Sequence, residues 1–172
     1  MCRIDDKSPM CYDIVKNAAK RNETSIVFDT SNAFRSSPEV WNPSYLSCIR
    51  FFNLGDVTDI FGILYYLDAC IKNDKPFYSR LRYIIFDNFA LISSPLVFGP
   101  KGSIKVLHEI GLCIKKFSFT NKICAIATNI ITIDAEGVRP ALGSLWGTIP
   151  HEKLMLSIVN RTPERKVPSR GN

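Results

Sequence analysis

Apolar residues along the chain follow two alternating patterns, short continuous runs and longer repeats at helical spacing. The continuous runs lie at residues 25–29, 50–53, 82–87, 122–128 and 153–159, and each predicts a buried β-strand. Continuously apolar strands that alternate with amphipathic helices are typical of a buried, mostly parallel sheet. The pattern therefore predicts an α/β fold with helices on both faces of the sheet.

Three long helices are predicted between these runs, each beginning at a residue that caps helices well. Ser8 opens the first with Pro9 behind it, Asp56 opens the second, and Ser103 opens the third, while Asn42 begins a shorter one. The core-facing positions of the three long helices are Met10, Cys11, Ile14, Val15, Ala18 and Ala19, then Val57, Ile60, Phe61, Leu64, Leu67 and Ile71, then Leu107, Ile110, Ile114 and Phe117.

Two segments are expected to be loops. Residues 92–103 hold Pro95, Gly99, Pro100 and Gly102, which interrupt regular structure. Residues 129–152 form the second, and a loop of that length inside a compact domain is usually functional or disordered.

Composition adds limits to this picture. The 172 residues suit one domain, 46% of them are hydrophobic, and no apolar run approaches the ~18 residues that a membrane span needs. The first residues contain no apolar core of a signal peptide. The six cysteines form no C-x-x-C pair and fall mostly in apolar stretches, so we expect buried free thiols of an intracellular protein. His108 and His151 lie far apart, and we expect no metal site built by this chain alone.

Half of the net charge of +6 lies in the last residues of the chain. Residues 160–172 carry Arg161, Arg165, Lys166 and Arg170 against Glu164, in a stretch rich in Pro, Ser and Gly. We expect a flexible basic tail behind a core domain of residues 1–159. The tail either keeps the protein soluble or contacts nucleic-acid phosphates, and its charge alone leaves both open.

The start of the chain, M-C-R-I-D-D-K-S, partly matches the phosphate-binding loop G-x-x-x-x-G-K-[ST]. Lys7 and Ser8 occupy the last two places, directly before a predicted helix, as that loop requires. Met1 and Asp6 stand where the loop needs glycines, and the charge of Asp6 would repel phosphates. The stretch indicates a nucleotide-binding fold whose nucleotide site has been lost, or simply a capped amphipathic helix.

Two aspartates end predicted strands. Asp29 and Asp87 both follow apolar runs, and ligands of parallel sheets bind beyond the carboxyl ends of the strands. An apolar strand that ends in Asp resembles a Walker B motif, whose carboxylate orients Mg²⁺. The same pattern arises where an aspartate caps a helix or stabilises a turn.

Four segments, taken in order, resemble the core of RecA-type recombinases, in particular the eukaryotic recombinase paralogs. They are F-D-T-S-N-A-F-R at 28–35, Y-I-I-F-D-N at 83–88, A-I-A-T-N-I-I at 125–131 and R-P-A-L-G-S-L-W at 139–146. The last is the most specific, and together they cover the chain from Lys7 to about residue 159. The resemblance implies a RecA-like P-loop NTPase core, truncated at the N-terminus before its first strand, which would lie centrally in the sheet.

Departures from the family imply a degenerate ATP site. The family places a catalytic glutamate shortly after the F-R pair, where Ser37 falls here and Glu39 fits only with an insertion. Ile130 stands in place of the nucleotide-sensing glutamine. Since each such group contributes orders of magnitude to the rate, we expect no catalytic residues and little or no intrinsic ATPase activity.

The resemblance implies a non-catalytic paralog in homologous-recombination DNA repair in the nucleus. It would form a heterodimer with an ATP-competent paralog, which supplies ATP and Mg²⁺, and would load, stabilise or remodel the strand-exchange recombinase filament on single-stranded DNA. Asp87 and Asn88 are expected at the partner interface, and no membrane is involved. The two DNA-facing loops of the family correspond to residues 92–103 and 131–153. The expected DNA-contacting residues are Lys101, Arg139, Arg165 and Lys166.

Two alternatives remain open from the sequence. One is an active DNA-dependent ATPase of the same family, with Lys7, Ser8, Asp87 and Glu39 in an unusual site. The other is an α/β interaction module without a role on DNA. Nucleotide titration distinguishes the active ATPase from the non-catalytic paralog. Binding to recombinase and to single-stranded DNA distinguishes the non-catalytic paralog from the interaction module.

Overall fold

A parallel β-sheet forms the centre of the computed structural model, which describes residues 8–30, 32, 34–35, 42–100, 102–134 and 137–154. The sheet contains β1 (Thr24–Asp29), β2 (Ile49–Phe52), β3 (Leu81–Asp87) and β4 (Cys124–Ala127) in the order β2-β1-β3-β4. All three strand pairings are parallel. The predicted α/β class and mostly parallel sheet are therefore confirmed.

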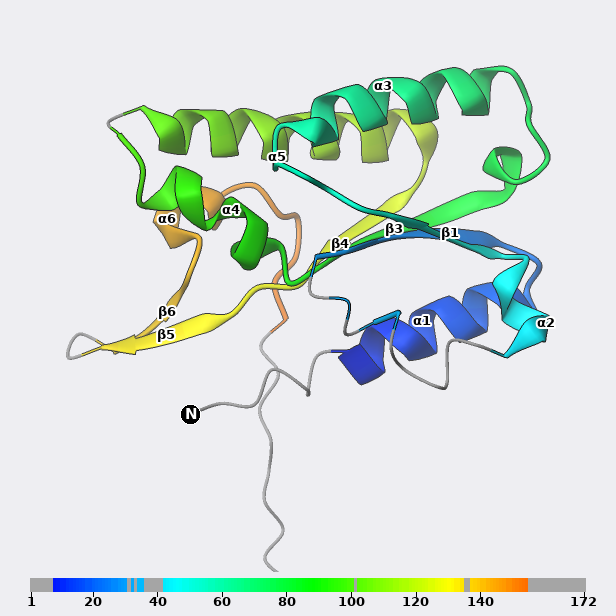
Figure 1. Ribbon diagram of the computed structural model, residues 1–172, viewed down its shortest axis with the longest axis horizontal. Helices are drawn as coiled ribbons and strands as arrows, with labels where there is room; N and C mark the ends of the chain where they lie inside the picture. The colour runs from blue at the N-terminus through cyan, green and yellow to red at the C-terminus, as the bar shows by residue number, and fades with distance from the viewer. Residues whose placement is uncertain are drawn as a thin grey trace, which may run out of the picture.

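Helices cover both faces of the sheet (Figure 1). One face carries α1 (Ser8–Lys20) and the short α2 (Pro43–Leu46), and the other carries α3 (Asp59–Lys72) and α5 (Ser103–Asn121). Asn42 caps α2 as expected, because its Oδ1 accepts a hydrogen bond of 3.0 Å from the Ser44 amide. The sequence thus predicted the start of α1, α2 and α5 and the layered arrangement around the sheet.

The core consists of two apolar clusters separated by the sheet. The larger cluster lies under α3 and α5, where the rings of Phe28 and Phe86 stack with centroids 4.6 Å apart. The smaller cluster joins α1 to the opposite face, and here Tyr12 packs edge-on against Phe34 at 4.4 Å. Burial of such apolar surface on both faces is what selects a continuously apolar strand over an alternating one.

The buried face of α3 differs from the expected face at two positions. Phe61 is 39% exposed, whereas Cys70 is buried. Asp56 does organise the turn before the helix, since its Oδ1 accepts from the Thr58 amide at 2.7 Å, but the helix begins three residues later at Asp59. Phe61 lies about 100° around the helix axis from Ile60, so it sits at the flank of the buried face and not on it.

Residues 92–103 are not a single loop, because α4 (Phe89–Val97) occupies their first half. Pro95 lies inside this helix and lacks the amide hydrogen that would bond to the Leu91 carbonyl. The Ser94 hydroxyl donates to that carbonyl at 2.9 Å instead. This replacement explains how a helix forms where the sequence pattern predicted an interruption.

Residues 129–152 are also more ordered than predicted. They contain a two-stranded antiparallel hairpin, β5 (Ile131–Asp134) with β6 (Gly137–Pro140), followed by α6 (Gly143–Trp146). Trp146 is buried and packs on Phe89 with ring centroids 4.8 Å apart. A Cβ on Gly111 would lie 2.4 Å from Ile149 Cδ1, so this glycine permits the close approach of the segment to α5. The R-P-A-L-G-S-L-W stretch therefore has a packing role.

The β4 edge of the sheet is open. Cys124 and Ala127 are exposed, Ala125 and Ile126 are half-buried, and in the described part of the chain β4 pairs with β3 alone. The prediction of a buried sheet and of buried thiols is therefore wrong for β4 and Cys124. The four strands pair directly with one another, without the gap that a missing central strand would leave.

The last predicted strand, 153–159, is only partly described. Lys153 and Leu154 lie outside any strand, while residues 155–159 and the tail of residues 160–172 fall outside the described residues. No helix in the described ranges is long and apolar enough to cross a membrane.

Candidate functional site at the carboxyl edge of the sheet

Asp29 and Asp87 lie side by side at the carboxyl edge of the sheet. They end β1 and β3, which are neighbours, and they are partners in the strand register. Each is only 4% exposed. The expectation that both aspartates occupy this edge is confirmed, and two carboxylates so close to the core need compensating contacts.

Asp87 is held from both neighbouring strands. The hydroxyl of Thr128, which follows β4, donates to Asp87 Oδ1 at 3.0 Å and accepts from the Asn88 amide at 2.6 Å. From the other side, the Thr30 hydroxyl donates to the Asp87 carbonyl at 2.8 Å. These contacts fix the end of β3 and the left-handed backbone of Asn88, which has φ of 54° and precedes α4.

Asp29 organises the loop that follows β1. Its Oδ2 accepts from the Arg35 amide at 2.6 Å, and the Arg35 guanidinium lies 5.1 Å from the Phe51 ring centroid and donates to Asn53 Oδ1 at 3.0 Å. Together with buried Phe34, these contacts explain the F-R pair as a structural anchor between the β1 loop and β2.

Three side-chain oxygens at this edge are buried without a hydrogen-bond partner among the described residues: Asp29 Oδ1, Asn88 Oδ1 and Asn129 Oδ1. An unsatisfied buried oxygen is costly, so such atoms point to a missing donor or cation. Carboxylate and amide oxygens are also the ligands that Mg²⁺ takes in proteins. Within the described ranges, no group of three or more His, Cys, Asp or Glu residues could hold a metal ion, so amide oxygens would have to complete such a site.

The start of α1 lies near Asp87. Burial raises the pKa of the Cys11 thiol, in the first turns of α1, to about 12, and the nearby Asp87 carboxylate adds to the shift. The structure thus brings the helix that begins at Ser8 to the carboxyl edge, as the resemblance to a phosphate-binding loop implied. A helix N-terminus at this edge favours negative charge.

Of the other predicted site residues, the structure describes only the backbone position of Arg139. Arg139 lies in β6 of the hairpin. The residues that fall outside the described part of the chain are Lys7, Glu39, Lys101, Arg165 and Lys166.

Thr128 and Asn129 lie in the segment 125–131 that resembles the family, but sequence reasoning did not connect Thr128 with Asp87. Thr128 and Asn129 follow β4, whereas Asp87 ends β3 and Asn88 follows it, so a polar pair at the end of each apolar run was the available signal. Recognising it required knowing that β3 and β4 are neighbours.

No protein-family model matches this chain, and no curated protein is significantly similar to it. The fold and the edge contacts define an α/β protein with an all-parallel sheet, compatible with a RecA-like core, that carries two buried aspartates where such sheets bind ligands.

Proposed function

We propose that the chain is the RecA-like core of a non-catalytic recombinase paralog. In this role it acts in homologous-recombination DNA repair in the nucleus and pairs with an ATP-competent paralog to load, stabilise or remodel recombinase filaments on single-stranded DNA. The observation that carries the proposal is the placement of Asp29, Asp87 and the N-terminus of α1 at one edge of a parallel sheet. This is where the four sequence segments that resemble the family would bring them.

The contacts of Asp87 favour a structural over a catalytic role. Its carboxylate is 4% exposed and accepts a hydrogen bond from Thr128, so it stabilises the junction of β3, β4 and α4. Ile130, which stands in place of the sensing glutamine, has no polar group to offer a γ-phosphate. A site without the loop glycines, the catalytic glutamate and the sensing glutamine binds nucleotide weakly and hydrolyses it slowly at best.

The open β4 edge supports an obligate partner. Among the described residues β4 has no strand on its outer side, and proteins normally cover or pair the backbone groups of such an edge. Half-buried Asn88 is positioned by the Asp87 and Thr128 contacts, so Asp87 would act on a partner interface indirectly.

Co-expression with a RecA-type paralog of the same cell tests the proposal. We expect the chain alone to be poorly soluble and the pair to elute as a stoichiometric complex. Asp87→Ala should weaken co-purification while ATP hydrolysis by the complex persists, and Asp56→Ala, an exposed aspartate on the turn before α3, serves as the control. A cooperatively melting monomer that ignores the paralog would contradict the proposal and favour an α/β interaction module without a role on DNA.

A second candidate, a DNA-dependent ATPase, rests on the unpaired oxygens of Asp29, Asn88 and Asn129. These atoms fit a hydrated Mg²⁺ that accompanies a nucleotide. A fluorescent ATP analogue with Mg²⁺ distinguishes the two candidates. The non-catalytic proposal expects no saturable binding at micromolar concentrations, whereas tight binding that Lys7→Ala abolishes would establish the ATPase.

A further inference from the structure

The amino edge of the sheet, opposite the aspartates, gathers cationic side chains. The carboxyl-terminal ends of α1, α3 and α5 meet the starts of β1, β3 and β4 here, on the right of Figure 1. Cations outnumber carboxylates among the described residues of this edge. The amino-edge surface consists of Lys20, Arg21, Arg50, Lys72, Lys75, Arg80, Arg82 and Lys122, with Glu23, Asp68 and Asp74 among them.

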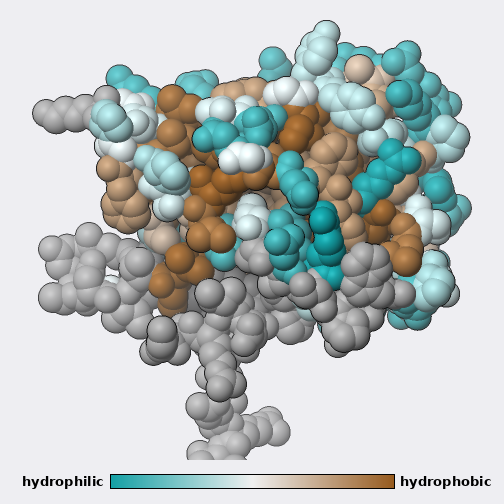
Figure 2. Space-filling view, viewed as in Figure 1, coloured by the Kyte–Doolittle hydropathy of each residue, from teal (hydrophilic) through white to brown (hydrophobic). Residues whose placement is uncertain are grey.

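Direct contacts join these segments into one surface. Arg80 donates to the Asn22 side chain, which links the start of β3 to the end of α1. Asn121 Nδ2 donates to Asp68 Oδ1 at 3.4 Å, which links α5 to α3. The same side of the space-filling view is predominantly hydrophilic (Figure 2). The cations therefore share one face although they are scattered along the sequence.

Much of this charge has no internal partner. Ion pairs join Lys72 to Asp68 at 2.5 Å and Arg21 to Glu23 at 2.8 Å. In the described ranges Lys75 and Lys122 have no carboxylate partner, and Arg82 donates to a backbone carbonyl. The helix dipole favours a cation at the carboxyl-terminal end of a helix, but Lys75 and Arg82 lie outside the helices, so this effect does not account for their charge. The uncompensated charge is available to an anion.

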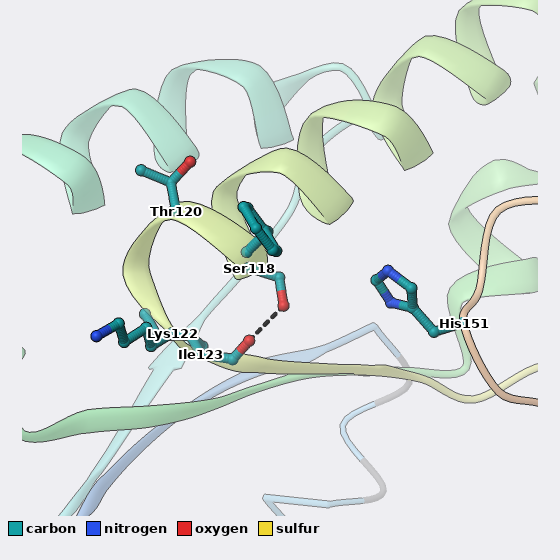
Figure 3. Close-up of a pocket in the computed structure, with 6 residues that line it drawn as sticks. Ser118, Thr120, Lys122, Ile123 and His151 are labelled. Atoms are coloured by element: carbon teal, nitrogen blue, oxygen red, sulfur yellow. Dashed lines mark hydrogen bonds between the residues drawn. The ribbon is translucent and has the colours of Figure 1, made fainter.

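An exposed aromatic ring and a hollow lie within this surface. Phe119, in the last turn of α5, is 83% exposed. It borders an open hollow whose other lining residues are Ser118, Thr120, Lys122, Ile123 and His151. In Figure 3 His151 reaches toward this end of α5 from the segment that follows α6, while the Ser118 hydroxyl is tied to the Ile123 carbonyl. The hollow thus combines an apolar ring with one cation, Lys122.

We propose that the amino-edge surface binds single-stranded nucleic acid. A base stacks on Phe119 in the hollow, and Lys122, Lys75 and Arg82 contact successive phosphates. Aromatic rings flanked by cations are the usual means of binding single strands without sequence preference. An acidic peptide would use the charge alone and would leave the exposed ring without a role.

This site lies apart from the nucleic-acid contacts expected at residues 92–103 and in the tail, and it shares only His151 with the expected segment 131–153. The inference does not rest on the proposed function, because it requires neither a paralog nor the carboxyl-edge site. If co-expression fails to yield a heterodimer, binding of single strands to the amino edge is still expected.

Fluorescence anisotropy of a labelled oligothymidylate of about 20 nucleotides, titrated with the full chain at two salt concentrations, tests the charge contribution. Lys122→Glu is expected to weaken binding at least fivefold and to reduce the salt slope by about 0.7 for the lost phosphate contact. Lys105→Glu makes the same charge change at the other end of α5 and is expected to change affinity less than twofold. Equal losses for both variants would show a non-specific charge effect and overturn the site.

The stacking contribution has its own matched pair. Phe119→Ala should weaken binding about tenfold without changing the salt slope, since stacking contributes about 1–3 kcal/mol per base. Tyr65→Ala removes a ring that is 81% exposed in the middle of α3 and should have no effect. Unchanged binding by Phe119→Ala would overturn the proposal. Binding of phosphatidylserine vesicles that requires Lys122 and Phe119, as oligonucleotide binding does, would also overturn the proposal, because the surface would then bind membranes.

Discussion

The two edges of the sheet use polar residues in opposite ways. At the carboxyl edge Asp29 and Asp87 are 4% exposed, and their oxygens accept hydrogen bonds from Arg35 and Thr128. At the amino edge Lys75 and Lys122 are exposed and have no carboxylate partner in the described ranges. Polar groups that are buried and bonded internally stabilise the fold, whereas exposed and uncompensated charges are free to bind a partner. Substitutions at the first edge should therefore affect stability, and those at the second should affect binding.

Thr128→Val should have the largest effect on stability. Valine has nearly the same shape, but it removes the Thr128 hydroxyl that donates to the buried Asp87 carboxylate and accepts from the Asn88 amide. We expect the free energy of unfolding to fall by about 3 kcal/mol, because one lost hydrogen bond is to a buried charged group and the other is to a backbone amide. Chemical denaturation with parallel fits of the slope measures the change.

Thr148→Val is the matched control for this substitution. Thr148 is exposed, and its hydroxyl donates only to the Leu145 carbonyl at 2.8 Å. Its replacement should cost less than about 0.5 kcal/mol. Comparable losses at the two threonines would show that the Asp87 network contributes nothing beyond an ordinary hydroxyl contact.

Sequence patterns predicted those elements whose stability comes from local periodicity and burial. The central strands and α1, α3 and α5 fit because their apolar repeats match the faces that the sheet buries. The helix α4 was missed because Pro95 is compensated by Ser94, a contact that periodicity does not report. Phe61 was placed in the core because it follows Val57 at i, i+4 spacing, but Val57 precedes the helix and does not share a helix face with it.

The carboxyl edge was partly predictable for a geometric reason. An aspartate after an apolar run lies at the ligand-binding edge of a parallel sheet, so Asp29 and Asp87 could be found from the sequence. Thr128 could not be assigned to them without the strand order. The amino-edge surface was missed altogether, since Lys75, Arg82 and Lys122 are far apart in sequence and gather only when three helices end at the same edge.

Cys11 offers a smaller effect through pH. Its pKa is about 12 in the folded chain and 9.0 in the unfolded reference, so the thiol ionises first in the unfolded state. The stabilisation is complete below pH 9 and is lost as pH rises toward 12, by about 1.4 kcal/mol at pH 10. The free energy of unfolding should therefore fall less steeply between pH 8 and pH 10 for Cys11→Ala than for Cys48→Ala. Cys48 is another buried cysteine, just before β2. Identical slopes of the unfolding free energy against pH for the two variants would show that ionisation of Cys11 does not cause this pH dependence.

Asp68→Asn should have the smallest effect on stability and sharpens the contrast between the edges. Asp68 pairs with Lys72 one helical turn away, and the hydrogen bond from Lys72 lowers the pKa of its carboxyl. Asp68 is half-buried and Lys72 is exposed, and pairs between residues four apart on a helix surface contribute only about 0.3–0.5 kcal/mol, so the free energy of unfolding should barely change. The substitution also frees Lys72 and removes a negative charge from the amino-edge surface, which should raise the affinity for the labelled oligothymidylate about twofold at low salt and less at high salt. Loss of stability comparable to that of Thr128→Val, with unchanged binding, would mean that this edge too is built for the fold and not for a partner.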